Sequence, residues 1–323
     1  MGTARKAGNK TALVTGGAGF IGSHVADAYL AHGWSVTVVD NLSSGRRENI
    51  PDGVDFVELD VRDPQLHELF DRKGGFELIN HHAAQVDVRL SVRRPEFDAD
   101  VNVLGLLNLL EAAREWQTRR LIFISSGGVV YGDADRRPIP EDAPKNPESP
   151  YGVSKLVGEY YLHCYRLLHG LDYVTLRYSN VYGPRQDPRG EAGVVAIFCN
   201  RLIAGQPLTV FGSGEQTRDY VYVDDVVDAN MIVSVAELDD GAGIDGRAFN
   251  VGSGRETSVT ELASALMAAA GREVPVEQAP ARPGELAWNS LEIGRLRALG
   301  WEAAVDLSDG LLRTYRWIAG VDE

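Results

Sequence analysis

Short apolar runs recur through the first half of the chain, separated by longer stretches of mixed character. The runs are rich in β-branched residues and are bounded by polar or glycine-containing segments, which is the pattern of buried strands. They predict strands over Ala12–Val14, Val36–Asp40, Phe56–Glu58, Leu78–His81 and Leu121–Ile124.

The stretches between these runs repeat their apolar residues at helical spacing. We expect helices over Phe20–His32 and Asp98–Glu115, the second with apolar residues recurring from Val101 to Leu110. Strands that alternate with helices pair in parallel through right-handed crossovers. The pattern therefore predicts an α/β fold, a Rossmann-type doubly wound parallel sheet.

After Tyr178 the pattern loosens into Gly- and Pro-rich loops and shorter helices such as Val194–Ala204. This change predicts a smaller C-terminal substrate-binding lobe, with a cleft between the two lobes. We expect a first domain over residues 1–178 and a second over 179–323. The strand-like runs Tyr220–Val223 and Phe249–Val251 suggest that segments near 219–251 return to the first domain.

Composition narrows the class of protein. With 323 residues, 44% of them hydrophobic, the chain can bury a large core. The net charge of −14 disfavours nucleic acid and acidic membranes as partners. No apolar run approaches the ~18 residues of a membrane span, so we expect a cytoplasmic protein. Cys164 and Cys199 fit neither a disulfide framework nor a metal site, and both are predicted packing residues.

Three glycines follow the first predicted strand at a spacing of three. In this motif Gly16 allows a tight turn, Gly19 lets the backbone approach a pyrophosphate, and Gly22 lets the helix pack closely on the strand. Asp40 ends the second strand about 20 residues further on, where a carboxylate accepts hydrogen bonds from ribose hydroxyls and repels a 2′-phosphate. The combination predicts NAD rather than NADP as the cofactor.

Tyr151 and Lys155 lie four residues apart on a predicted helix, so they share one face. We expect the ammonium group to lower the pKa of the phenol, which can then remove a proton from a hydroxyl as hydride leaves the same carbon. The strand ending at Ile124 places a further hydroxyl at its carboxyl end, from Ser126 or, as the alternative, Ser125. This set predicts hydride chemistry at a carbon that carries a hydroxyl group.

Ordered motifs along most of the chain resemble the extended short-chain dehydrogenase/reductase family, and within it the UDP-glucose 4-epimerase group. The similarity runs from Thr11 to about Trp301. Besides the residues above, it rests on Asp40-Asn41, Asp60-Val61, His81-His82-Ala83-Ala84-Gln85, Arg177-Tyr178-Ser179-Asn180, Arg218-Asp219-Tyr220-Val221 and Arg282-Pro283-Gly284-Glu285.

The resemblance implies further site residues. It places on the cofactor Phe20, Ile21, Asn41, Ser44, Gly45, Asp60, Val61, His82, Ala83, Ala84, Gln85, Asn102 and Tyr178. It places on a UDP-sugar substrate Ser126, Tyr151, Ser179, Asn180, Arg185, Val194, Thr209, Val210, Phe211, Arg218, Arg282 and Glu285. It also implies a homodimer, no metal, and an NAD that stays bound and is regenerated in each cycle.

The implied reaction is 4-epimerisation of a UDP-hexose through a 4-keto intermediate, with UDP-glucose and UDP-galactose as the expected pair. UDP-N-acetylglucosamine and UDP-glucuronate are alternative substrates, since Arg185 or Ser179 could meet a carboxylate. Decarboxylation is disfavoured because this chain has no acid between Ser125 and Tyr131 to assist it. Dehydration is disfavoured because Gly127-Gly128 stands where a dehydratase has an acid pair. A catalytically silent NAD sensor is the remaining alternative.

Overall fold

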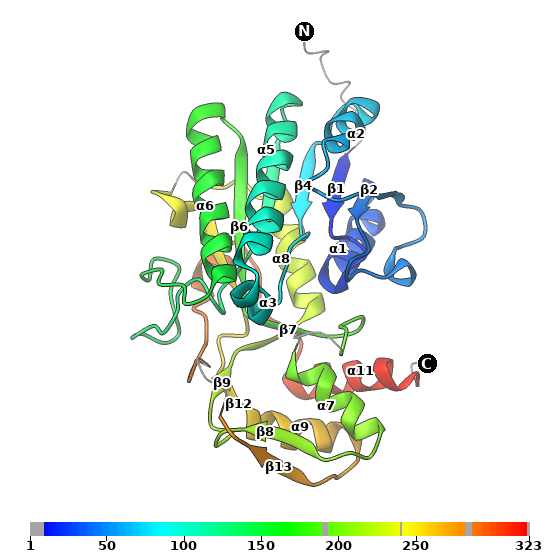
Figure 1. Ribbon diagram of the computed structural model, residues 1–323, viewed down its shortest axis with the longest axis vertical. Helices are drawn as coiled ribbons and strands as arrows, with labels where there is room; N and C mark the ends of the chain where they lie inside the picture. Colours follow the sequence, from blue (N-terminus) through cyan, green and yellow to red (C-terminus); the bar gives the residue numbers. More distant parts are fainter. Residues whose placement is uncertain (1–9, 189–192, 240, 282–285, 322–323) are drawn as a thin grey trace. The chain divides into compact units, whose positions relative to one another are not determined.

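The structure is a computed structural model that describes residues 10–188, 193–239, 241–281 and 286–321. Helices and strands alternate in its first half (Figure 1). The strands are β1 (Thr11–Thr15), β2 (Ser35–Asp40), β3 (Asp55–Glu58), β4 (Leu78–His81), β5 (Arg120–Ser126), β6 (Asp172–Tyr178), β7 (Asn180–Tyr182), β8 (Leu208–Phe211), β9 (Thr217–Arg218), β10 (Tyr220–Tyr222), β11 (Ala248–Val251), β12 (Thr257–Ser258) and β13 (Val276–Ala279). The helices are α1 (Phe20–Ala31), α2 (Gln65–Lys73), α3 (Val88–Arg93), α4 (Pro95–Ala99), α5 (Gly105–Glu115), α6 (Pro150–His169), α7 (Val194–Ile203), α8 (Val223–Val235), α9 (Val259–Ala270), α10 (Gly294–Arg297) and α11 (Leu307–Ala319), with 3-10 turns η1 (Arg47–Asn49) and η3 (Ile244–Arg247) and a π-helical turn η2 (Asp100–Leu104).

A seven-stranded parallel sheet confirms the predicted fold class. Its strand order is β3-β2-β1-β4-β5-β6-β11, so the order reverses between β1 and β4. Ala12, Leu13 and Val14 of β1 are fully buried, as expected for a strand covered by helices on both faces. In doubly wound sheets, ligands bind outside the carboxyl ends of the strands at the point of reversal.

The chain forms two compact units that interleave along the sequence. Unit 1 comprises Met1–Ser125, Pro147–Leu176 and Asn230–Ala248, and unit 2 comprises Ser126–Asn146, Arg177–Ala229 and Phe249–Glu323. The segment between β5 and α6 belongs to unit 2, and the chain returns to unit 1 at α6.

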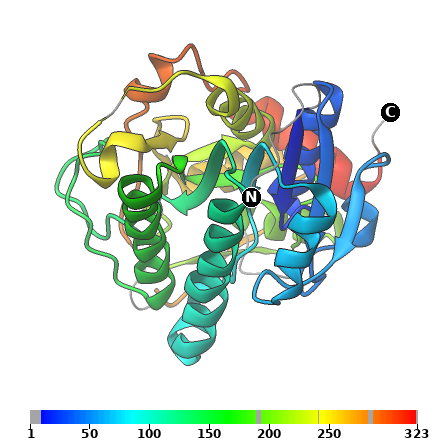
Figure 2. The ribbon, with the colours of Figure 1, turned by 90° about the horizontal axis from the view of Figure 1, so that it is seen from above.

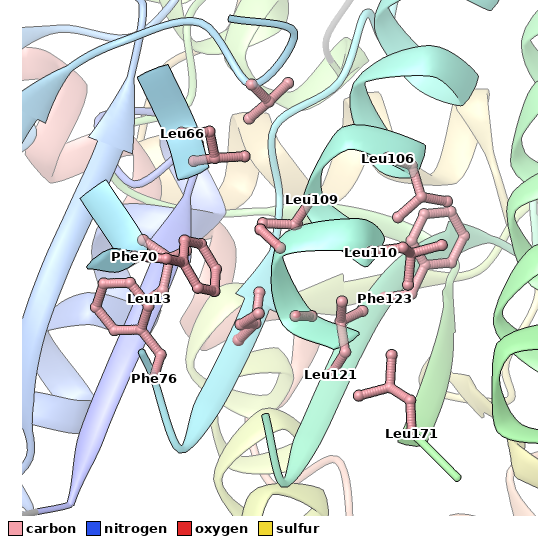
Figure 3. Packing of buried hydrophobic residues seen from close by; sticks show 14 of the residues in the cluster. Leu13, Leu66, Phe70, Phe76, Leu106, Leu109, Leu110, Leu121, Phe123 and Leu171 are labelled. Carbon is pink, nitrogen blue, oxygen red and sulfur yellow. The ribbon is translucent and has the colours of Figure 1, made fainter. Parts of the chain in front are cut away.

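The main core of unit 1 lies between the sheet and helices α2, α5 and α6. Helices α5 and α6 run side by side in both ribbon views (Figures 1 and 2). Figure 3 shows Leu109 and Leu110 of α5 packed among Phe70, Leu121 and Phe123, and all five side chains are almost fully buried. At about 25 cal/mol per Å² of apolar surface, such burial is the main source of stability for this unit.

A second set of contacts ties the end of α8 to the first strands. The hydroxyl groups of Tyr29 and Ser234 lie 2.6 Å apart, and Asn80 donates to Asn230 at 2.9 Å. These polar side chains are fully buried and joined by hydrogen bonds, which hold the end of α8 in place within unit 1.

Unit 2 contains three small strand pairs and a helical layer. Strands β7 and β10 pair in parallel, as do β8 and β13, whereas β9 and β12 are antiparallel. Helices α7, α9 and α11 pack on one another. The guanidinium of the fully buried Arg177 donates to the Tyr131 hydroxyl at 2.9 Å and to the Glu141 carbonyl at 2.8 Å, which ties residues 126–146 into this unit.

Two details of the predictions were wrong. The helix expected over Asp98–Glu115 is interrupted by the π-helical turn η2, and a short helix begins before it at Pro95. Cys199 is buried as expected, but Cys164 is exposed, because the apolar residues of α6 extend beyond its packed face. Among the described helices, none combines the length and the apolar character that a membrane crossing requires.

Candidate functional site

The glycine turn after β1 is closed by backbone contacts. Gly16 adopts a φ of 70° and its N–H donates to the Val39 carbonyl at 2.8 Å. A Cβ at Gly16 would lie 2.6 Å from the Ala83 nitrogen, and one at Gly22 would overlap the Gly16 carbonyl oxygen. Side chains are therefore excluded from this turn, which leaves a backbone cradle at the start of α1, the arrangement that binds a pyrophosphate.

The side chain of Asp40, at the end of β2, contacts the glycine turn. Its carboxylate accepts hydrogen bonds from the Ala18 N–H at 3.0 Å and from the Leu42 N–H at 2.8 Å. A Cβ at Gly45 would lie 2.8 Å from the same carboxylate, so the loop after β2 also approaches it closely. Burial raises the pKa of Asp40, whereas these backbone donors lower it. The carboxylate is thus fixed in place and keeps free lone pairs for ribose hydroxyl groups.

Asp60 and Asn41 form a second cluster beyond β2 and β3. The Asn41 amide donates to Asp60 at 2.7 Å, and the Arg62 guanidinium holds both carboxylate oxygens, at 2.8 and 2.7 Å. Arg62 also pairs with Asp100. The Arg62 hydrogen bonds hold the pKa of Asp60 well below its usual range.

We predict that Asp60→Asn removes an acid-sensitive part of the stability. Because the pKa of Asp60 is lowered in the folded state, its contribution is present above its unfolded pKa of about 4 and is lost as the pH falls below it. The contribution at neutral pH is at most about 1 kcal/mol, since solvent screens this partly exposed pair. Since this loss runs down through the lowered pKa of the folded state, urea unfolding at pH 7 and pH 3 should show a smaller difference between the two proteins at pH 3. Asp71→Asn, at an exposed position of α2, is the control, and a constant difference at both pH values would contradict the assignment.

Gln85 and Asn102 are joined by reciprocal hydrogen bonds. The Gln85 N–H donates to the Asn102 side-chain oxygen at 2.8 Å, and the Asn102 amide donates to the Gln85 carbonyl at 2.9 Å. Both amides also reach the carboxylate of Asp98, and the Asn102 amide reaches the Ser154 hydroxyl at 3.2 Å. Asp98 was not among the predicted site residues. Its only sequence signal is an acid one turn before Asn102 on a helix otherwise predicted to be amphipathic.

Tyr151 and Lys155 are both buried near the start of α6. The Lys155 ammonium donates to the Ile124 carbonyl of β5 at 2.9 Å and lies 5.8 Å from the centre of the Tyr151 ring. Gly158 lets the helix approach the sheet, because a Cβ there would lie 2.6 Å from the Phe123 ring. The helix therefore brings the phenol and the ammonium together at the carboxyl end of β5.

The expectation that Lys155 lowers the pKa of Tyr151 was wrong, because the surrounding protein raises this pKa. Burial of the phenol raises its pKa, and the negative charge of Asp98 raises it further. Burial also lowers the pKa of Lys155 to about 8, against the opposing charges of Asp98 and Glu159. Spacing along the sequence finds the pair but not its surroundings, and burial together with the charge of Asp98 sets the direction of the shift.

The two serines that end β5 differ in their contacts. Ser125 is buried and its hydroxyl donates to Glu159 at 2.6 Å. Ser126 is only half-buried and belongs to unit 2. Because the Ser125 hydroxyl is committed to a buried carboxylate, Ser126 is the better candidate for contact with a substrate.

The remaining predicted cofactor residues of unit 1 lie around the cradle. Phe20 and Ile21 begin α1, and Ser44 is exposed in the loop after β2. Val61 is buried, and His82, Ala83 and Ala84 directly follow β4. The burial of His82, together with the charge of Lys155, lowers its pKa to about 3, so this imidazole is neutral at physiological pH. Of the predicted cofactor residues, Tyr178 alone belongs to unit 2.

The predicted substrate residues other than Tyr151 belong to unit 2. They comprise Ser126, Ser179, Asn180, Arg185, Val194, Thr209, Val210, Phe211 and Arg218, whereas Arg282 and Glu285 lie outside the described residues. Arg218 donates to the carbonyls of Thr217 and Leu286, at 2.7 and 2.9 Å. The buried hydroxyl of Ser179 has no hydrogen-bond partner within the described residues. It is therefore a polar group available to a ligand.

Comparison with known proteins agrees with this geometry. The model of the NAD dependent epimerase/dehydratase family matches residues 12–252. The chain belongs to this family. It is 47% identical to the UDP-glucose 4-epimerase of Mycolicibacterium smegmatis, over 94% of this chain and 96% of the relative. The glycine cradle and Asp40 fit the cofactor in the family's name, and NAD is the cofactor of this protein.

Solved structures of family members match almost the full chain. The UDP-glucose 4-epimerase of Thermotoga maritima with UDP-glucose is 43% identical, with a TM-score of 0.91 over 96% of this chain and 99% of that one. The UDP-glucose 4-epimerase of Thermus thermophilus in complex with NAD is 42% identical, with a TM-score of 0.88 and the same coverage. The resemblance inferred from the sequence motifs is thereby confirmed at the level of the family.

Proposed function

We propose that this protein is an isomerase that interconverts the C4 epimers of a UDP-hexose, with UDP-glucose and UDP-galactose as the pair. The observation that carries the proposal is the buried Tyr151 and Lys155 pair on α6, in the same unit as a glycine cradle for NAD. Sequence identity of 47% to a named UDP-glucose 4-epimerase supports the choice of reaction.

In the proposed mechanism, Tyr151 removes the proton of the 4-hydroxyl group and later returns it. Lys155 holds its ammonium at the end of β5 beside the phenol, and Ser126 donates a hydrogen bond to the reacting oxygen. Bound at the glycine cradle and Asp40, NAD would supply the hydride acceptor for C4 and the donor for its return to the other face of the sugar. Since the cofactor is regenerated in every cycle, we expect it to stay bound.

The substrate nucleotide is assigned to residues of the second domain. We propose that Asn180, Arg218 and Arg282 hold the diphosphate, since planar guanidinium groups suit its paired oxygens. Thr209, Val210 and Phe211 are assigned to the uracil, and Glu285 to the ribose. Ser179, Arg185 and Val194 complete this set. In this assignment residues 1–178, with segments near 219–251, bind NAD, and residues 179–323 bind the nucleotide sugar.

Product analysis tests the proposed reaction. The purified protein is incubated separately with UDP-glucose, UDP-N-acetylglucosamine and UDP-glucuronate, and the products are separated by anion-exchange chromatography. We expect UDP-galactose from UDP-glucose, without net formation of NADH. A C4 epimer formed only from one of the other two sugars would change the substrate and keep the reaction. A pentose, a dehydrated sugar or no product from any of them would refute the proposal.

We further propose that the protein is a cytoplasmic homodimer that joins copies through α5 and α6. Three large residues of α6 are more than half exposed, namely Tyr160 at 56%, Leu167 at 71% and Leu168 at 69%. Apolar exposure of this extent on one helix is typical of a surface covered by a partner. Light scattering after gel filtration should give twice the monomer mass, and Leu168→Glu should shift it toward the monomer. A wild-type monomer would contradict the proposal.

A further inference from the structure

A buried carboxylate joins three segments around the proposed proton-transfer pair. Asp98, at the end of α4, is 1% exposed. Its Oδ1 atom accepts hydrogen bonds from the Gln85 side chain at 2.7 Å and from the Asn102 side chain at 3.1 Å. Within the described residues, its other oxygen, Oδ2, has no hydrogen-bond partner. Oδ1 thus accepts both of these hydrogen bonds, and Oδ2 accepts none from the described residues.

Asn102, which reaches this carboxylate, lies in the π-helical turn η2. A π turn widens a helix locally by one residue and is often found at functional sites. Here it falls between α4 and α5, and the Asn102 amide is shared among the Gln85 carbonyl, Asp98 and the Ser154 hydroxyl. Since Ser154 precedes Lys155 on α6, the loop after β4, the π turn and the helix of the proton-transfer pair are held as one network.

We propose that Asp98 is a positioning residue for the reaction, whose carboxylate fixes Gln85 and Asn102 and places a negative charge beside Tyr151 and Lys155. This inference rests on the proposed function. Asp98 acts through these groups and is not assigned any contact with the substrate or the cofactor.

The charge of Asp98 bears on both members of the pair. It raises the pKa of Tyr151 after the larger effect of burial, and it opposes the lowering of the Lys155 pKa by burial. Glu159, one turn further along α6, also opposes that lowering, whereas the buried His81 and the half-buried His82 are neutral because desolvation lowers their pKa values to about 3. Asp98 is therefore the one carboxylate among these groups that acts on both Tyr151 and Lys155.

Asp98→Asn separates the charge from the hydrogen bonds. The amide oxygen can replace Oδ1 as the acceptor for Gln85 and Asn102, and the amide nitrogen takes the place of Oδ2, which has no partner to lose. Removing a nearby negative charge lowers the pKa of both Tyr151 and Lys155. We expect both limbs of the pH profile of kcat to move to lower pH by about one unit.

A matched control uses the same chemical change on the same helix. Glu96 is exposed on α4, and Glu96→Gln should leave the pH profile as in the wild type. Glu159→Gln should move only the limb governed by Lys155, since Glu159 affects that group and not Tyr151. If the profile of Asp98→Asn coincides with the wild-type profile, the electrostatic part of the proposal is refuted.

NAD binding tests the positioning role without turnover. Asp98→Ala removes the acceptor that the side-chain amides of Gln85 and Asn102 share. The Gln85 amide then keeps its contact with the Asp87 carbonyl, and the Asn102 amide keeps those with the Gln85 carbonyl and Ser154. Calorimetric titration of NAD into cofactor-free protein should show about tenfold weaker binding for Asp98→Ala and near wild-type binding for Asp98→Asn. Wild-type affinity of a folded Asp98→Ala would overturn the positioning role. If Asp98→Ala does not fold, the profile of Asp98→Asn decides.

The pH profile of kcat and the NAD titration together also distinguish failure of this inference from failure of the proposed function. A wild-type protein without activity on any UDP-sugar would refute the function, and the NAD titration would still decide whether Asp98 positions Gln85 and Asn102. An active wild type with unchanged Asp98 variants would refute the inference and leave the function intact.

Discussion

Replacing Tyr151 with phenylalanine is expected to lower kcat for epimerisation by about 10³-fold, because a positioned acid or base typically contributes 10² to 10⁴ in rate. The substitution removes only the phenol oxygen, and the buried ring keeps its place at the start of α6. UDP affinity and the NAD content of the purified protein should therefore stay close to those of the wild type. Steady-state kinetics and titration calorimetry with UDP measure the two quantities.

Tyr160 provides the control for this prediction. It lies on the same helix, and 56% of its surface is exposed. Tyr160→Phe makes the same chemical change away from the proposed site and should leave kcat unchanged. A Tyr151→Phe variant that interconverts the epimers at a comparable rate would show that the phenol is not the proton acceptor.

Gly22→Ala is expected to destabilise the protein by about 2 kcal/mol and to weaken NAD binding by at least tenfold. Alanine should favour helix α1 by about 1 kcal/mol through its intrinsic propensity. However, the added Cβ would overlap the carbonyl oxygen of Gly16, which is backbone and cannot rotate away. Forced overpacking of this kind typically costs 1 to 3 kcal/mol, and here it also displaces the turn that forms the cradle. Urea unfolding and calorimetry with NAD give both values.

Gly294→Ala is the matched control for Gly22→Ala. Gly294 begins α10, and a Cβ there would come no closer than 3.8 Å to a neighbouring atom. This variant should be as stable as the wild type or slightly more stable. A Gly22→Ala protein with unchanged stability and NAD affinity would mean that the turn tolerates a side chain.

The strands of the first half were predictable because buried parallel strands are continuous apolar runs. Each predicted strand of the first half lies within one or two residues of its observed bounds, as with Leu121–Ile124 inside β5. The glycine turn and Asp40 were equally predictable from the sequence, since their roles depend on local backbone geometry and spacing. Such features are encoded by residues that are close in sequence.

The network around Asp98 was not predictable for the opposite reason. A π turn adds one residue to a helical repeat, and the apolar spacing from Val101 to Leu110 does not reveal it. The reversed pKa of Tyr151 depends on burial and on the charge of Asp98, and both arise only when distant segments pack. The choice between Ser125 and Ser126 likewise required the position of Glu159.

The buried Arg177 has a consequence for dividing the chain. Its acceptors, the Tyr131 hydroxyl and the Glu141 carbonyl, come from the segment that unit 2 takes from between β5 and α6. A fragment that starts at residue 177 would therefore bury this cation without these two acceptors, which destabilises the fragment. Split-protein reporters or autonomously expressed halves should fail when the chain is severed there. Circular permutants should fold when their new termini leave residues 126–146 intact.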